Sequence, residues 1–160
     1  GVGGHCIAVD PWFIVAKSPE QAKIIHTARL VNDGKPLWVQ EKVKSALAQH
    51  LIDNPSKTAK EVSIACYGLA FKPDIDDLRE SPALEITKAL AQSLPCQILA
   101  VEPNIQQLPQ SLSMANLELS SLERTLASAD IHVMLVDHKQ FKATKVADEL
   151  TIIDCKGIWR

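Results

Sequence analysis

Between residues 61 and 154 the sequence alternates short apolar segments with segments of helical pattern, and this alternation restricts the fold more than any other feature. The apolar segments lie at 61–67, 96–101, 130–136 and 151–154, and the helical patterns between them at 81–90, 121–128 and 142–150. Such alternation predicts an α/β fold, a parallel sheet with helices on both faces. Functional residues are then expected in loops at the carboxyl ends of the strands.

The first third of the chain has a helical pattern from Pro11 to about Asn54. The run 32–36 (Asn-Asp-Gly-Lys-Pro) predicts a break, because glycine ends helices and proline cannot continue one. A second helix is expected to start at Pro36. The segment 54–58 is a candidate linker, so we expect two domains, at 1–57 and 58–160.

Composition excludes several classes of protein. The 160 residues are 46% hydrophobic and 22% charged, with a net charge of −2, which gives no overall attraction to nucleic acid or to an anionic membrane. No apolar run approaches the roughly 20 residues of a membrane span. The cysteines Cys6, Cys66, Cys96 and Cys155 are scattered, so no metal site is expected. We expect a protein of the reducing cytoplasm, with Cys66 and Cys96 in the core.

The N-terminal segment indicates a reactive thiol. Three glycines precede Cys6, Asp10 follows it by four residues, and Pro11 favours a helix start there, with Asp10 as its N-cap. The first turn of a helix favours negative charge and hence a thiolate. A lone cysteine is most often a small buried hydrophobe, but the preceding glycines and the following helix start leave both interpretations open.

The loop after the first apolar segment carries cations in place of a glycine cradle. It has one glycine, Gly68, where a dinucleotide fingerprint needs three, so the sheet is not expected to bind the pyrophosphate of NAD in the usual way. Lys72 and Arg79 suit phosphate as a point charge and a fork. The alternative is a solvated charged loop.

Two segments together resemble one family. The segment 1–13 (Gly-Val-Gly-Gly-His-Cys-Ile-Ala-Val-Asp-Pro-Trp-Phe) resembles the catalytic-cysteine segment of the UDP-glucose/GDP-mannose dehydrogenase family, and 68–83, with Gly-Leu-Ala-Phe-Lys-Pro-Asp and Arg-Glu-Ser-Pro-Ala, resembles the signature that opens its UDP-binding domain. The form His-Cys-Ile-x-Val-Asp-Pro and the ending 154–160 are most similar to the branch that acts on UDP-N-acetyl-D-mannosamine. The resemblance covers essentially the whole chain.

This resemblance implies a Rossmann-like UDP-binding domain at 58–160, preceded by the cysteine loop and a helical dimerisation segment at 1–57. It implies NAD as cofactor, bound mainly by a further N-terminal domain, a UDP-sugar substrate and a homodimer through the central helices, with no nucleic acid or membrane partner. The roles that it implies are nucleophile for Cys6, base or water-orienting group for Asp10, sugar contact for Gly3 and Gly4, UDP binding for Phe71, Lys72 and Lys156, and cofactor contact for Arg79.

The reaction that the resemblance implies oxidises the sugar C6 alcohol to a carboxylate in two hydride transfers, through a thiohemiacetal and a thioester on Cys6. The product would be the uronic acid of enterobacterial common antigen and related surface polysaccharides. UDP-glucose and UDP-N-acetylglucosamine are alternative substrates. In isolation the chain is alternatively a binding and dimerisation module, expected to bind UDP weakly and to reduce no NAD. A third class, cysteine hydrolase, needs a histidine in reach of Cys6.

Overall fold

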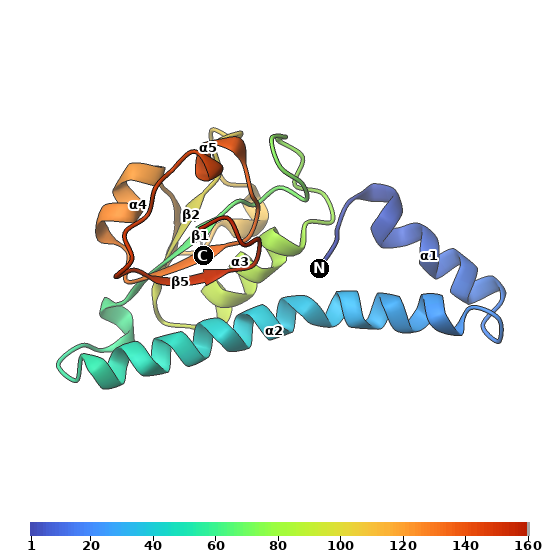
Figure 1. The fold of residues 1–160 in the computed structure, drawn as a ribbon, viewed down its shortest axis with the longest axis horizontal. Helices are drawn as coiled ribbons and strands as arrows, with labels where there is room; N and C mark the ends of the chain where they lie inside the picture. Colours follow the sequence, from blue (N-terminus) through green and yellow to red (C-terminus); the bar gives the residue numbers. More distant parts are fainter. Residues whose placement is uncertain (160) are drawn as a thin grey trace.

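The computed structural model describes residues 1–159, apart from the side chain of His5. A helical hairpin leads into an α/β unit (Figure 1). In chain order the elements are α1 (His5–Lys17), α2 (Lys23–Asp53), the 3-10 turn η1 (Ala59–Glu61), β1 (Ser63–Tyr67), α3 (Pro82–Ser93), β2 (Gln97–Val101), the 3-10 turn η2 (Gln110–Leu112), β3 (Leu117–Leu119), α4 (Leu122–Ser128), β4 (Ile131–Met134), α5 (Lys139–Lys142) and β5 (Thr151–Asp154).

The strands form one parallel sheet in the order β3-β2-β1-β4-β5, which confirms the predicted fold class. The chain builds outward from β1 to one edge, then crosses to β4 on the other side of β1. The carboxyl ends of β1 and β4 are therefore the switch point where α/β sheets bind ligands. Strand β3 was not expected, because three residues inside a polar region give too short a pattern to detect.

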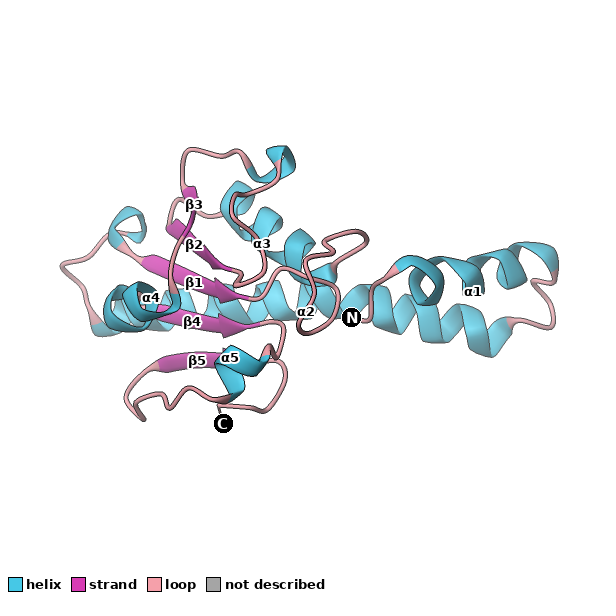
Figure 2. Ribbon diagram, turned by 90° about the horizontal axis from the view of Figure 1, so that it is seen from above, coloured by secondary structure: helices cyan, strands magenta, loops and turns pink. Residues whose placement is uncertain are grey.

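Side chains alternate between two buried faces along each central strand. Ile64 and Cys66 of β1 join the core under α2 and α3, while Ala65 and Tyr67 join the core under α4 and α5. Cys66 and Cys96 are buried, as predicted. Helix α2 supplies Val39, Val43 and Leu47 to the first core, so its C-terminal half is one layer of the α/β unit (Figure 2).

The predicted break at 32–36 is wrong, because α2 runs unbroken from Lys23 to Asp53 with Pro36 inside it. An interior proline leaves the carbonyl four residues earlier, that of Asn32, without a helical donor and costs about 3 kcal/mol. Packing overrides this cost. The N-terminal half of α2 lies along α1 and its C-terminal half lies under the sheet (Figure 1). Gly34 does not adopt a positive φ and lies within α2 like its neighbours, so it imposes no turn.

The start of the first helix also differs from the prediction. Helix α1 begins at His5 with Gly4 as its N-cap, at φ 98°, and Pro11 lies inside it. Asp10 is therefore a mid-helix residue and caps nothing. Gly4 sets this earlier helix start. Glycine readily adopts a positive φ, and here that φ ends the extended segment seven residues before Pro11.

The helical patterns predicted at 81–90 and 121–128 are confirmed, and the side chains of Ser81 and Ser121 cap α3 and α4. The helix expected at 142–150 is wrong. A single turn, α5, lies earlier because Phe141 is the side chain that the core buries there. Within residues 1–159 no helix combines the length and apolar character of a membrane span.

Candidate functional site

Gly68 turns the chain at the end of β1, at the switch point. Its φ is 89°, and a Cβ there would lie 2.4 Å from the Cβ of Val136, which follows β4. Only glycine fits this turn. The turn starts the loop 68–81, which contains Phe71 and Lys72 and lies on the side of the sheet nearest α1 (Figure 2).

The N-terminal glycines dock directly on this loop. The Gly4 N–H donates to the carbonyl of Glu80 at 3.3 Å, and a Cβ on Gly3 would lie 2.1 Å from the same oxygen. A Cβ on Gly4 would lie 2.9 Å from the ring of Phe71. Three of the predicted site residues, Gly3, Gly4 and Phe71, are thus brought together, and the glycines are what permits the approach.

Cys6 and Asp10 lie in α1, four residues apart and so on one face of the helix. Both are exposed. Cys6 is two residues from Gly4, which keeps its backbone within about 7 Å of the docked segment. The hydrogen bonds of the described side chains include none between a histidine and Cys6, and the side chain of His5 lies outside this description.

The two predicted cations of the loop differ in their surroundings. Lys72 is exposed, with its Nζ 5.6 Å from the Phe71 ring centroid. Arg79 forms a two-pronged ion pair with Asp77, Nε to Oδ1 at 2.9 Å and Nη2 to Oδ2 at 2.7 Å. These bonds raise the pKa of the already basic guanidinium. Arg79 is therefore held in one direction while most of its side chain stays exposed.

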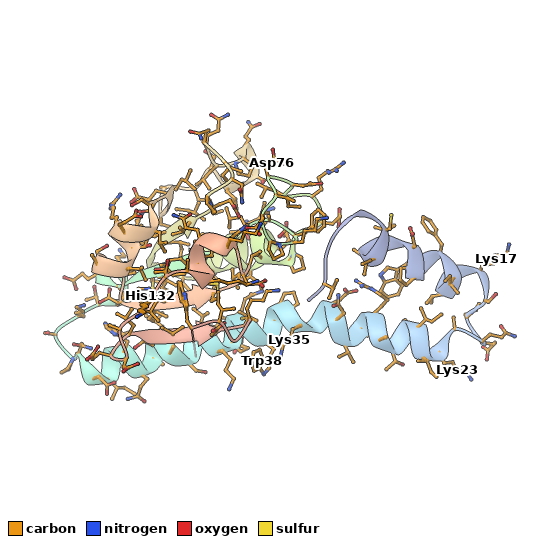
Figure 3. All side chains as sticks on the ribbon, turned by 45° about the horizontal axis from the view of Figure 1, so that its top comes forward. Lys17, Lys23, Lys35, Trp38, Asp76 and His132 are labelled. Atoms are coloured by element: carbon orange, nitrogen blue, oxygen red, sulfur yellow. The ribbon has the colours of Figure 1, made fainter. Side chains whose placement is uncertain are left out.

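A chamber of about 80 Å³ is lined by Phe71 and Lys156. Lys156 is placed by the turn after β5, where the Asp154 carboxylate accepts the N–H groups of Lys156 and Gly157 at 2.8 Å each. Lys35 of α2 lines the same chamber. Its Nζ lies 3.5 Å from the Trp38 ring centroid, and Figure 3 shows the two side by side.

Sequence reasoning missed Lys35 because the expected break at 32–36 detached it from the sheet. It also missed a buried pair, Glu102 after β2 and His138 after β4, whose Oε2 and Nε2 are 3.0 Å apart. Their positions could have indicated them, because Glu102 directly follows the apolar segment 96–101 and His138 lies two residues beyond the segment 130–136.

The sheet itself does not fit a dinucleotide. The N–H groups of Leu69 and Ala70, which open the β1 loop and would face a pyrophosphate, donate to the Glu102 carboxylate at 2.7 and 3.1 Å. A phosphate at this position would meet an internal carboxylate. The expectation of no NAD cradle in this sheet is drawn from the single glycine, and this contact is a second reason for it.

The sequence also matches a known protein family. Residues 65–160 match the UDP-glucose/GDP-mannose dehydrogenase family, UDP binding domain. The chain belongs to this family. Its predicted resemblance to UDP-glucose/GDP-mannose dehydrogenases is therefore confirmed.

Individual family members match the chain over its whole length. It is 59% identical to the UDP-N-acetyl-D-mannosamine dehydrogenase of Yersinia pestis and 56% identical to that of Escherichia coli (strain K12), and it spans 38% of the length of each. The solved UDP-N-acetyl-mannosamine dehydrogenase from S. aureus superposes on the whole chain with a TM-score of 0.72 and 32% identity, over 35% of its own length. A UDP-D-ManNAc dehydrogenase from Pyrococcus horikoshii gives 0.73 and 27%, over 36% of its length.

Proposed function

We propose that this chain supplies the UDP-binding and nucleophile-bearing part of an NAD-dependent UDP-N-acetyl-D-mannosamine 6-dehydrogenase that serves surface polysaccharide synthesis. One observation carries the proposal: Gly3 and Gly4 dock against Glu80 and Phe71, which joins the two motif segments into one site. Whole-chain identity of 56–59% to enzymes of this name supports the choice of sugar.

In this proposal the UDP moiety lies along the loop after β1. Lys72 and Lys156 supply positive charge for the diphosphate, and Phe71 supplies an apolar wall. The chamber beside Phe71, at about 80 Å³, holds only part of a nucleotide, so the remainder lies over exposed Lys72. Gly3 and Gly4 leave backbone close to the sugar.

Cys6 carries the covalent chemistry. Its thiolate adds to the carbonyl carbon of the C6 aldehyde and forms a thiohemiacetal, whose oxidation gives a thioester. Water, oriented or deprotonated by Asp10, then adds to the thioester carbonyl and releases the carboxylate and the Cys6 thiolate. NAD, when bound, supplies the hydride acceptor for both oxidations. Because the sheet does not fit it, only Arg79 of this chain is assigned to it.

We also propose a cytoplasmic homodimer formed through α1 and α2. Four free cysteines suit a reducing compartment.

The helical hairpin supports the dimer. Large apolar side chains are exposed on it, including Phe13 at 68%, Ile24 at 85% and Val31 at 71%. Apolar patches of this kind mark interaction sites.

A panel of UDP-sugars against the full-length protein that carries this chain, with NADH formation followed, tests the proposal. We expect the highest kcat/KM for UDP-N-acetyl-D-mannosamine. Cys6→Ser should abolish carboxylate formation, whereas Cys155→Ser should still form the carboxylate, although this other exposed thiol lines the chamber beside Phe71. Normal acid formation by Cys6→Ser would refute the nucleophile assignment.

Calorimetry tests the 160-residue chain itself. We expect weak UDP binding, no NADH production, and weaker binding still for Lys72→Ala. Lys60→Ala is the control, because Lys60 is also exposed but precedes β1, at the opposite end of the sheet. An unchanged affinity in Lys72→Ala would count against its phosphate role.

A further inference from the structure

We propose that Glu102 and His138 form a buried clasp that positions the UDP-binding loop at 69–74, so that binding of the diphosphate depends on two residues that need not touch it. The inference rests on the proposed function, because it assigns Phe71 and Lys72 to UDP. Both clasp side chains are almost fully buried, with 0% of the Glu102 side chain and 1% of the His138 side chain exposed.

Glu102 holds the first part of the loop. Its Oε2 accepts the N–H groups of Leu69 and Ala70, at 2.7 and 3.1 Å. Its Oε1 accepts two bonds from Asn104, from the backbone N–H at 3.1 Å and from Nδ2 at 3.0 Å. With His138, this carboxylate accepts five hydrogen bonds from four residues, so both of its oxygens are satisfied despite their burial.

His138 holds the far part of the loop. The N–H of Asp74 donates to His138 Nδ1 at 2.9 Å, so Nδ1 is the unprotonated nitrogen. The proton is thereby assigned to Nε2, which donates to Glu102 Oε2 at 3.0 Å. One imidazole therefore links the chain after β1 to the chain after β2.

Phe71 and Lys72 lie between these two attachments. Ala70 precedes them and Asp74 follows them, so their backbone is restrained from both sides. Asp74 has a φ of 60°, which non-glycine residues rarely adopt and which costs about 1–3 kcal/mol. Its side chain accepts the N–H of Lys139 at 2.9 Å, next to His138. The clasp thus imposes a strained loop shape that the loop sequence alone would not select.

The electrostatics agree with this role. Burial by itself raises the pKa of Glu102, but the hydrogen bonds from His138, Leu69 and Asn104 outweigh it and hold the pKa below the usual range. The ionised carboxylate takes the amides that would otherwise attract phosphate. A diphosphate is left with the lysine side chains, Lys72 on the exposed side of the same loop and Lys156 in the chamber beside Phe71.

Two substitutions at one position test the clasp, with UDP as the probe and calorimetry on the 160-residue chain. His138→Gln places an amide nitrogen near the Nε2 position, so it keeps the bond to Glu102 and loses the acceptor for Asp74. His138→Asn places an amide oxygen near the Nδ1 position, so it keeps that acceptor. We expect UDP affinity to fall about tenfold in His138→Gln, the effect of one hydrogen bond, and to change less than about threefold in His138→Asn.

His132→Asn is the matched control, because His132 is equally buried in β4 but bonds to Tyr67. His132→Asn should lower stability and leave UDP affinity unchanged. If the effect of His138 were merely structural, the His138 variants and His132→Asn would change UDP affinity alike. Equal affinity in His138→Gln and the unsubstituted chain would overturn the proposal, as would equal losses in all three variants.

Hydrogen–deuterium exchange of the unliganded chain separates this inference from the proposed function. His138→Gln should speed exchange of the Asp74 amide, and His138→Asn should not. If the unsubstituted chain binds no UDP, the proposed function fails, and exchange still decides whether the clasp holds the loop. Unchanged exchange in His138→Gln would overturn the clasp whatever UDP does.

Discussion

Arg29 donates a hydrogen bond from Nη1 to the carbonyl oxygen of Ile7, at 3.3 Å, and Ile7 is the residue whose carbonyl Pro11 leaves without a helical donor. Proline has no N–H to offer four residues on. Arg29 is 8% exposed and its guanidinium also pairs with Asp33. The long helix α2 therefore repairs the break in α1 just after Cys6.

A double-mutant cycle tests this repair. Arg29→Met should lower the free energy of unfolding by about 1–3 kcal/mol, because the Ile7 carbonyl loses its donor. In a Pro11→Ala background, residue 11 supplies the missing N–H, so the same substitution should cost about 1 kcal/mol less. Urea unfolding followed by circular dichroism measures both. Equal costs in the two backgrounds would show that Arg29 acts through Asp33 alone.

Two glycine-to-alanine substitutions should have opposite effects, one favourable to stability and the other harmful to the site. Gly34→Ala places a methyl group in open space on α2 and should stabilise the chain by about 0.5–1 kcal/mol. Gly3→Ala places one 2.1 Å from the Glu80 carbonyl, so the N-terminal segment must leave its site on the loop. We expect weaker UDP-sugar binding and slower turnover in the full-length protein with Gly3→Ala. Unaltered kinetics would separate the glycine segment from the site.

The parallel sheet was predictable because its signals are local. Strands β1, β2 and β4 are short apolar runs, as buried parallel strands require. Ser81 and Ser121 cap α3 and α4 through hydrogen bonds to N–H groups three residues further on. The continuity of α2 through Gly34 and Pro36 was not predictable. It depends on α1 and the sheet covering its two halves, and those contacts come from distant segments.

The candidate site divides in the same way. Cys6, Phe71 and Lys72 lie in contiguous motifs, so the sequence alone could name them. Glu102 and His138 are 36 residues apart and are joined only because the strand order places β2 and β4 on either side of β1. No local pattern encodes that order, so the clasp required the structure.

Stability should depend on pH through His132. Burial lowers its pKa below the usual value near 6.5, because a buried imidazolium loses its hydration. As the pH falls below about 6.5, the unfolded chain takes up a proton that the folded chain refuses, so the free energy of unfolding decreases. His132→Asn keeps an acceptor for the Tyr67 hydroxyl and should flatten this decrease by up to about 1 kcal/mol per pH unit. His26→Asn, on the exposed surface of α2, is the control.

Lys35 should contribute to UDP binding although no motif contains it. It lines the chamber with Phe71 and Lys156, and a third cation near the diphosphate would add Coulombic attraction. We expect Lys35→Gln to weaken UDP binding several-fold, on the order of 1 kcal/mol, and more at low salt than at high salt. Lys42→Gln is the matched control, because Lys42 also lies over Trp38 but does not line the chamber. Equal effects of the two substitutions would assign the change to Trp38.

The exposed face of α2 should hold two copies together. Val31 and Ile52 are equally exposed, at 71%, but Val31 lies in the half of α2 beside α1 and Ile52 lies in the half under the sheet. If the hairpin is the interface, Val31→Glu buries a charge between copies and should convert a dimer into monomers in analytical ultracentrifugation. Ile52→Glu adds the same charge outside the interface and should leave the dimer intact. Dissociation by both substitutions would indicate general repulsion, and dissociation by Ile52→Glu alone would place the interface at the other end of α2.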